Sequence, residues 1–397
     1  MKMKYKLLPL IYFTFPIIFL LFAVGSCNQS GEKLTRKAYL KSFNCPIKGK
    51  KSLKIDKIDL NKVCLENANS SLQGSIYFRG NRQYFVDYRF CWVFEYDLNG
   101  KLLNRKVGRG KGPLELPVSA IDAFQFDQSG NAYFMGPNYN VYVFDKNWKR
   151  ENGFLLEKHY LRDTPVPEKD INPSNLGLYS IEYLKFILRF GRGYFYIPVG
   201  GSYPEIYSPY SSIDHYLQCF TLAKFDSKSG KFLELQGRRT PELLNYSFLS
   251  QFEFFSYDLD LNDNMYVGHE IDSLIYYYDD KQKLINKFGF AGQEMRCDYQ
   301  GYSGRDIVRM QADRLKFSYY DWIEYIDETG LLFRSYFKNP SCKYDGLQIY
   351  GHGDLFGDIN VPKGFQVRYY KEPFYYSNVF IDEEANAMWV YKFTLPR

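Results

Sequence analysis

Three features of the 397-residue sequence predict an all-β fold, a six-bladed β-propeller of four-stranded antiparallel blades. Aromatic residues make up 19% of the chain, which favours strands. A unit of apolar strand, short polar turn and apolar strand recurs six times, and a second hairpin follows most of its copies. Two consecutive hairpins form a four-stranded meander, which is the unit of a propeller blade.

The first hairpin of each unit has a short turn rich in Asp, Asn and Gly. Its clearest copy is "FQFDQSGNAYFM" at residues 124–135. The other copies cover residues 77–86, 188–197, 256–267, 324–333 and 379–390. Apolar runs separated by such turns are typical of β-hairpins, so six copies predict six blades.

The second hairpin carries an aspartate where its turn begins. The copies cover residues 92–108, 141–154, 221–237 and 274–289, with Asp97, Asp145, Asp226 and Asp279 at the turns. An aspartate in this position accepts hydrogen bonds from nearby backbone N–H groups, so we expect all four to be structural. In the fifth blade, we expect the second hairpin within residues 336–372.

An N-terminal strand is expected to close the ring of blades. The chain ends directly after the unit at 379–390, so the sixth blade lacks its outer strands. The alternating segment "KKSLKIDKIDL" (50–60) is expected to pair there and to cover an exposed sheet edge. The propeller is therefore assigned to residues 46–397, after a flexible tether at 27–45.

The N-terminus is typical of an exported lipoprotein. A lysine-rich start, "MKMKYK", precedes an apolar run that ends in Val24-Gly25-Ser26-Cys27. This tetrad resembles a lipobox, so we expect residues 1–26 to be a signal peptide and Cys27 to carry the lipid. The expected location is the outer membrane, facing the periplasm or the cell surface. A membrane-spanning helix is the alternative, because the run is about long enough, although two prolines interrupt it.

Charge and cysteine content exclude several functional classes. The formal net charge of +6 falls to +3 when residues 1–26, with their three lysines and no acids, are removed. There is no basic run, so no nucleic-acid partner is expected. Six cysteines remain after Cys27, and they form neither a CxxC pair nor the spacing of a zinc site. The sequence predicts no metal and no cofactor.

A glycine-rich segment, "KVGRGKGPLELP" (106–117), looks at first like a phosphate-binding loop. A Walker motif requires Ser or Thr after its lysine, whereas Lys111 is followed by Gly112 and Pro113. Related glycine loops begin after other second hairpins, at Gly237 and Gly289. We therefore interpret the segment as a linker between blades, where glycine permits a positive φ.

The lipobox, the aspartate turns and the "GRGKGP" linker before "AFQFDQSGNAYF" resemble the six-bladed β-propeller lipoproteins of Bacteroidetes, whose blades look like the NHL type. Residues 222–244 and 260–279 are similar to the branch catalogued as a domain of unknown function. The resemblance covers residues 70–395 and brings no catalytic residues. The wider group has Gly-Pro-Gly-Glu in the linker, where this chain has Gly-Pro-Leu-Glu at 112–115.

The topology of a propeller predicts which face binds a ligand. Turns between strands one and two, and between three and four, lie on one face, while two–three loops and linkers lie on the other. Three long insertions, at 157–184, 198–216 and 290–320, all fall on the second face, which predicts a binding surface over the channel. The candidate ligand residues are Arg109, Lys111, Tyr203, Tyr207, Tyr210, Arg238, Arg239 and Arg296.

Simpler interpretations of these residues stay open. Ordinary loop packing would explain the tyrosines, and solvated surface charge would explain the basic residues. Residues 304–315 are expected to form a short amphipathic helix, with Ile307, Met310 and Leu315 toward the propeller.

The sequence therefore predicts a lipid-anchored, exported module that binds a glycan, a peptide or a protein partner. An enzyme is the alternative, a hydrolase or lyase with carboxylates at the mouth of the central channel. No catalytic residue can be assigned. The four histidines lie in no HExxH or triad-like context, and the segment 258–269 lacks the glycine and the final glutamate of a calcium loop.

Overall fold

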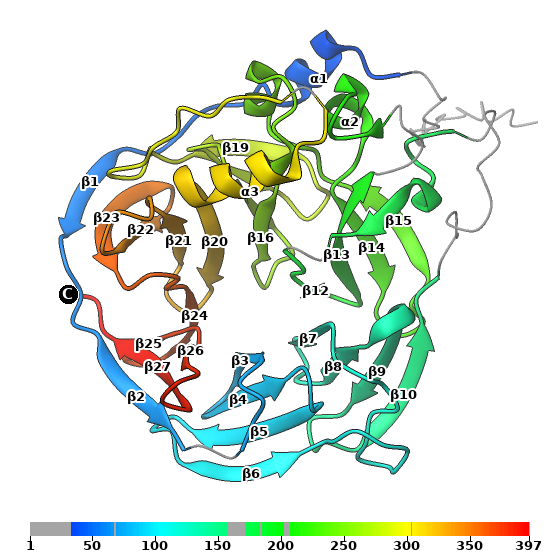
Figure 1. Ribbon diagram of the computed structural model, residues 1–397, viewed down its shortest axis with the longest axis vertical. Helices are drawn as coiled ribbons and strands as arrows, with labels where there is room; N and C mark the ends of the chain where they lie inside the picture. Colours follow the sequence, from blue (N-terminus) through cyan, green and yellow to red (C-terminus); the bar gives the residue numbers. More distant parts are fainter. Residues whose placement is uncertain are drawn as a thin grey trace, which may run out of the picture. The chain divides into compact units, whose positions relative to one another are not determined.

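Six antiparallel sheets surround a central channel in the compact unit Leu34–Arg397, as the six-bladed propeller requires (Figure 1). The structure, a computed structural model, describes residues 33–66, 69–157, 171–182, 185–201, 207–302 and 304–396. The predicted signal peptide, Cys27 and Tyr203 lie outside the described residues. No helix in the described part is long and apolar enough to cross a membrane.

Three blades are regular meanders that run from the inner strand to the outer strand. Blade one consists of β3 (Gly74–Arg79), β4 (Arg82–Asp87), β5 (Trp92–Asp97) and β6 (Leu102–Lys106). Blade two consists of β7 (Ala123–Phe126), β8 (Ala132–Met135), β9 (Asn140–Phe144) and β10 (Arg150–Leu155). Blade four consists of β16 (Phe255–Leu259), β17 (Met265–His269), β18 (Ile275–Tyr278) and β19 (Leu284–Phe288).

Blades three and five are variations on this plan. The inner edge of blade three is split between β11 (Tyr179–Ile181) and β12 (Arg189–Gly191), which both pair with β13 (Tyr194–Gly201). Its outer strands are β14 (Leu222–Asp226) and β15 (Phe232–Gln236). Blade five consists of β20 (Tyr319–Ile326), β21 (Leu331–Phe337), β22 (Asp345–Gly351) and β23 (Asp354–Val361). Its second hairpin lies inside the predicted range 336–372.

An N-terminal strand closes the ring at blade six, as predicted, but it is a different strand from the predicted one. The closing strand is β2 (Asn61–Leu65), which pairs antiparallel with β27 (Ala387–Phe393). The predicted segment 50–60 contains β1 (Lys51–Ile55), which pairs in parallel with β23 of blade five. The N-terminal chain thus covers the outer edges of two neighbouring blades.

The assignment of the unit 379–390 to a first hairpin was wrong. The first hairpin of blade six is β24 (Val367–Lys371) and β25 (Phe374–Ser377), and β26 (Phe380–Asp382) pairs with β27 beside it. Residues 379–390 therefore join the second and third strands, and the chain's end leaves only one strand missing. The β24–β25 turn, around Glu372 and Pro373, lacks the Asp and Gly residues by which the other turns were aligned.

The aspartates of the turns have the structural role that the sequence predicts. Asp97 Oδ1 accepts hydrogen bonds from the backbone N–H groups of Asn99 and Lys101, at 2.8 and 3.0 Å. Asp145, Asp226 and Asp279 accept equivalent backbone hydrogen bonds. These carboxylates are used by their own turns.

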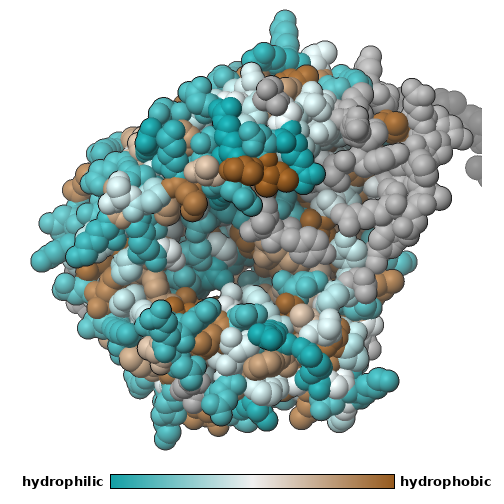
Figure 2. Space-filling view, viewed as in Figure 1, coloured by the Kyte–Doolittle hydropathy of each residue, from teal (hydrophilic) through white to brown (hydrophobic). Residues whose placement is uncertain are grey.

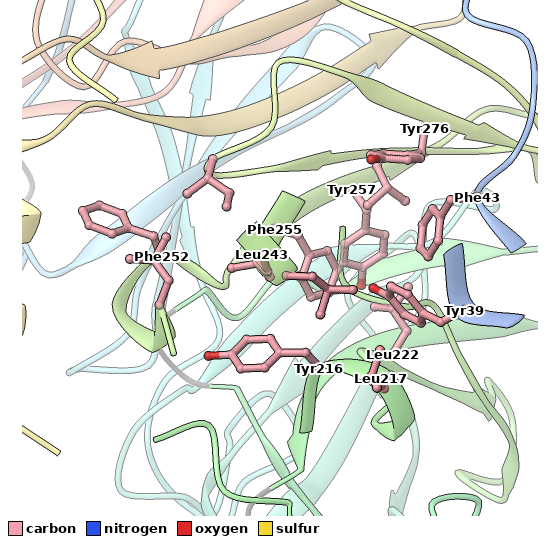
Figure 3. Close-up of a cluster of buried hydrophobic side chains, with 14 of the residues drawn as sticks. Tyr39, Phe43, Tyr216, Leu217, Leu222, Leu243, Phe252, Phe255, Tyr257 and Tyr276 are labelled. Atoms are coloured by element: carbon pink, nitrogen blue, oxygen red, sulfur yellow. The ribbon is translucent and has the colours of Figure 1, made fainter. Parts of the chain in front are cut away.

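A helix joins the N-terminal chain to the core. Thr35 caps α1 (Arg36–Ser42), with its Oγ1 accepting from the N–H of Ala38. The Tyr39 side chain is fully buried, and the Phe43 ring lies 5.5 Å from that of Tyr276, in a cluster between blades three and four (Figure 3). The described end of the predicted tether 27–45 is therefore packed against the propeller.

The insertions carry two further helices on the face of the two–three loops and linkers, here called the insertion face. They are α2 (Ile213–Gln218) and α3 (Ile307–Lys316), and α3 crosses in front of the sheets in Figure 1. Short 3-10 helices cover Pro137–Tyr139, Leu176–Leu178, Pro241–Asn245 and Ser250–Phe252.

The predicted orientation of α3 was wrong for two of its three apolar residues. Ile307 and Leu315 are 48% and 68% exposed, and only Met310 packs partly against the core. Asp313 is buried instead and accepts a hydrogen bond from the Tyr302 hydroxyl, while Arg314 reaches the buried Glu270. Because buried charges need partners, polar contacts decide which side of α3 faces the propeller.

Candidate functional site: the central channel

The inner strands enclose a cavity of about 310 Å³ in the central channel. Its wall also includes the strand one–two turn of blade two, from Asp127 to Gly130, so the cavity lies toward the face opposite the insertions. Figure 2 shows the other side of the molecule, the insertion face, with a hollow near its middle. The inner strands of the six blades contribute, in chain order, Arg79, Gln125, Arg189, Asp258, Glu324 and Arg368.

Arg189 is held by two carboxylates from neighbouring blades. Its guanidinium binds both oxygens of Glu324, at 2.7 and 3.3 Å, and its Nε lies 3.2 Å from Asp258 Oδ1. Trp322 Nε1 donates to Glu324 Oε2 at 2.9 Å. Backbone N–H groups of Leu259 and Tyr325 donate to Asp258. This group of charges is therefore fully hydrogen-bonded within the protein.

The ionisation of Asp258 is shifted by its surroundings. Burial raises the pKa of Asp258 to about 7, an effect that Arg189 opposes and the negative charge of Glu324 reinforces. A carboxyl group with a raised pKa beside a cavity is a candidate proton donor.

Arg368 is the exception among these charges. Its guanidinium lies 3.9 Å above the ring of Trp322, and it has no hydrogen-bond or ion-pair partner among the described residues. By contrast, the guanidinium of Arg79 donates to the backbone carbonyls of Gly130 and Lys146 and to the Tyr84 hydroxyl. Burial lowers the pKa of Arg368, the charge of Arg189 lowers it further, and Glu324 partly offsets both.

Apolar and aromatic side chains complete the cavity wall. The cavity is lined by Ile76, Phe78, Phe126, Phe190 and Leu259 in addition to the polar residues above. Polar and charged side chains make up about half of this wall, so the cavity suits a ligand that has polar as well as apolar groups.

The opposite end of the channel is occupied by a second charge group, here called the insertion-face network: Lys185, Glu270, Arg314 and Asp321. Lys185 Nζ lies 2.7 Å from Glu270 and 3.3 Å from Asp321. Arg314 of α3 binds both oxygens of Glu270, at 2.6 and 3.0 Å. Glu270 has no exposed side-chain surface, so its charge depends on these partners.

The structure does not gather the predicted ligand residues into one site, and none of the described ones lines the channel cavity. Tyr207 is buried, and Arg239 is buried in an ion pair of 2.7 Å with Glu253. Arg238 stacks on Phe220 at 3.7 Å and donates to the Gln218 carbonyl. For these three residues, packing is the role that the structure shows.

The remaining predicted residues are more exposed. Arg109 and Lys111 lie in the linker after blade one, where Arg109 donates to the carbonyls of Arg89 and Ser119. Arg296 donates to Asp298 at 3.1 Å, and the Tyr210 ring lies 5.5 Å from the guanidinium of Arg305.

Arg189, Glu324 and Arg368 are the residues that the sequence analysis missed. Each is a charged residue between apolar or aromatic neighbours on an inner strand, in "ILRFG", "WIEYI" and "FQVRYY". An inner strand of a propeller faces the channel, so a charge within it was the available signal.

Comparison with known proteins supports the fold. No protein-family model and no curated protein matches the chain. A solved structure of a DUF4221 family member from Bacteroides vulgatus has 12% identity and a TM-score of 0.59, over 87% of this chain and 100% of that one. A predicted exported protein from Bacteroides fragilis has 12% identity and a TM-score of 0.51, over 88% and 99%. The resemblance to propellers of unknown function from Bacteroidetes is thus confirmed at the level of the fold.

Proposed function

We propose that this protein is an exported, lipid-anchored binding module whose ligand occupies the channel cavity. The observation that carries the proposal is the cavity itself, about 310 Å³, lined by charged, polar and apolar side chains that include residues from all six inner strands. Its size lies within the range of small-molecule sites, and the polar groups that converge on it would orient a ligand. Contact of the insertion face with a larger glycan, peptide or protein partner stays a separate prediction.

Two observations support export and anchoring. The sequence ends its apolar run in a lipobox at Cys27, and the similar structure from Bacteroides fragilis is that of a predicted exported protein. We expect Cys27→Ser to move the protein from the membrane fraction to the soluble fraction of cells. An unchanged distribution would contradict lipid anchoring at this cysteine.

Ligand binding in the channel is tested with a screen of compounds and with a variant whose cavity is filled by a larger side chain. Purified full-length protein is screened by thermal shift against oligosaccharides, peptides and small organic compounds. A ligand at 100 times its Kd stabilises the folded state by about 2.7 kcal/mol, so a true ligand raises the melting temperature measurably. Leu259→Trp places a large side chain at the cavity wall and is expected to abolish the shift.

Leu261→Trp is the matched control, because Leu261 is 60% exposed, lies two residues further along the chain and does not line the cavity. It should respond to the ligand as the unmodified protein does. Equal responses in the two variants would show that the ligand binds elsewhere.

A hydrolase or lyase is the second candidate, and the raised pKa of Asp258 beside Glu324 favours it. Against it, both carboxylates accept hydrogen bonds from Arg189 or backbone groups. Mass spectrometry of screened compounds after incubation would decide: products that form with the protein and disappear with Asp258→Asn would establish catalysis.

A further inference from the structure

We infer that the ligand of the channel cavity carries a single carboxylate, which binds the guanidinium of Arg368, on an aromatic or apolar body. The inference rests on the proposed function, since it assumes that the cavity binds a ligand. The observation behind it is the juxtaposition of three features: a guanidinium without a hydrogen-bond or ion-pair partner among the described residues, the Trp322 ring, and the apolar side chains of the wall.

A local irregularity gives Arg368 its position. The pairing of β24 with β25 shifts register between Val367 and Tyr369, so Arg368 is the extra residue of a β-bulge. Bulges redirect side chains and are common beside functional sites. The guanidinium rests on Trp322, which Glu324 holds through the indole N–H.

The charge of Arg368 is costly in the free protein. Burial and the nearby positive charge of Arg189 both disfavour it, as the lowered pKa of Arg368 indicates. Glu324 compensates only in part, because both of its oxygens already bind Arg189. An anion that enters the cavity would supply the missing partner.

The geometry suits an anion that accepts two parallel hydrogen bonds, such as a carboxylate. A guanidinium offers two parallel N–H groups along an edge, and these match the two oxygens of a carboxylate. Stacking on Trp322 occupies a face of the guanidinium and leaves its edges free.

The other cavity residues limit the ligand to one negative charge. Arg189 is bound by Asp258 and Glu324, and Arg79 by backbone carbonyls and Tyr84. Among the described residues of the cavity wall, Arg368 is thus the one guanidinium without a partner. Beyond it, rings such as those of Phe126 and Phe190 suit an uncharged, apolar body.

The test compares matched probes on the full-length protein. Isothermal titration and thermal shift are run with acetate, benzoate, phenylacetate and indole-3-acetate, and with the amide of each. At least one aromatic carboxylate is expected to bind roughly 10- to 100-fold more tightly than its amide. Arg368→Met should remove this preference, and Arg368→Lys should restore it in part, because lysine keeps the charge without the fork of N–H groups.

The control variant is Arg105→Met. The Arg105 guanidinium lies 4.5 Å from the Trp92 ring, on the outer strand β6, so it reproduces the stacking away from the channel. It should leave carboxylate binding unchanged.

Three results would overturn the inference. They are equal affinities for acids and amides, a preference that survives Arg368→Met, and no binding by any carboxylate of the panel. Neutral compounds that bind the unmodified protein but not Leu259→Trp would at the same time uphold the channel as the binding site. The two proposals can therefore fail separately.

Discussion

The two ends of the central channel both contain buried charges, but they use them differently. In the insertion-face network, Lys185 and Arg314 are ion-paired with Glu270, which is completely buried. In the cavity, Arg368 rests on Trp322 and has no partner among the described residues. A buried charge thus points to a ligand site only where it is unpartnered and borders free space.

The elements that supply the charges differ in the same way. The insertion-face network takes Lys185 from the segment between β11 and β12, Glu270 from the β17–β18 loop and Arg314 from α3, and only Asp321 comes from an inner strand, β20. It therefore ties the insertions to the blades. The charges of the cavity come from inner strands, whose positions are set by the sheets. We expect the first group to stabilise the fold, and we propose that the second contacts a ligand.

The largest expected effect separates the two ends by stability. Glu270→Gln leaves Arg314 and Lys185 without their buried anion, and we expect it to lower the free energy of unfolding by about 3–5 kcal/mol. Arg368→Met breaks no ion pair and should change it by less than about 1 kcal/mol. Urea unfolding measures both, and equal losses would contradict the distinction between the two ends.

A second effect is a loss of folding stability in acid, which we expect from Glu253. Although burial alone would raise it, Arg239 and His215 lower the pKa of Glu253 to about 2, from 4.5. The stabilisation from this pKa difference, about 3 kcal/mol, is complete above pH 4.5 and is lost as the pH falls toward 2. Glu253→Gln should flatten the pH dependence of unfolding in this range.

Glu234 provides the control for that measurement, since its ion pair with Lys224 is about half exposed. Glu234→Gln should leave the acid limb of the stability curve as it is. If both variants changed it equally, Glu253 would have no special role in acid stability.

Asp258, at the cavity end of the channel, should make folding stability depend on pH in the opposite direction. Because the pKa of Asp258 is raised from 3.8 to about 7, the folded state holds a proton that the unfolded state loses at lower pH. Stability from this group therefore falls as the pH rises from about 4 to about 7, by on the order of 4 kcal/mol for this pKa difference. Asp258→Asn should remove this decline in urea unfolding curves. A decline that persists would place its origin in another group.

The fold was largely predictable because it is repetitive and local. Hairpins depend on residues close in sequence, so their turns predicted six blades. Closure was less predictable: β1 and β2 are both short segments of alternating character, and the alternation does not say which distant edge each will meet. The structure gave β2 to blade six and β1 to blade five.

The candidate site was not predictable in the same way, because it depends on contacts between distant residues. Arg189 and Glu324 are 135 positions apart in the chain. The absence of a partner for Arg368 is likewise a property of three blades and not of any one strand. For Arg239 the sequence was misleading in the opposite direction. Its loop sequence predicted an exposed charge, whereas the structure shows it buried against Glu253.

The smallest expected effect tests the two sides of α3. Val308 and Leu315 are 79% and 68% exposed, so Leu315→Ser should change the free energy of unfolding by no more than about 0.5 kcal/mol. Its neighbour Arg314 reaches Glu270, and Arg314→Met should cost several times more, since it leaves a buried carboxylate with one cation fewer. Urea unfolding of the two variants compares adjacent residues of one helix, and the lower helix propensity of serine is included in the bound of about 0.5 kcal/mol. A larger loss from Leu315→Ser would mean that α3 is held by its apolar side chains, and that the paired charges at this end of the channel do not hold the insertions in place.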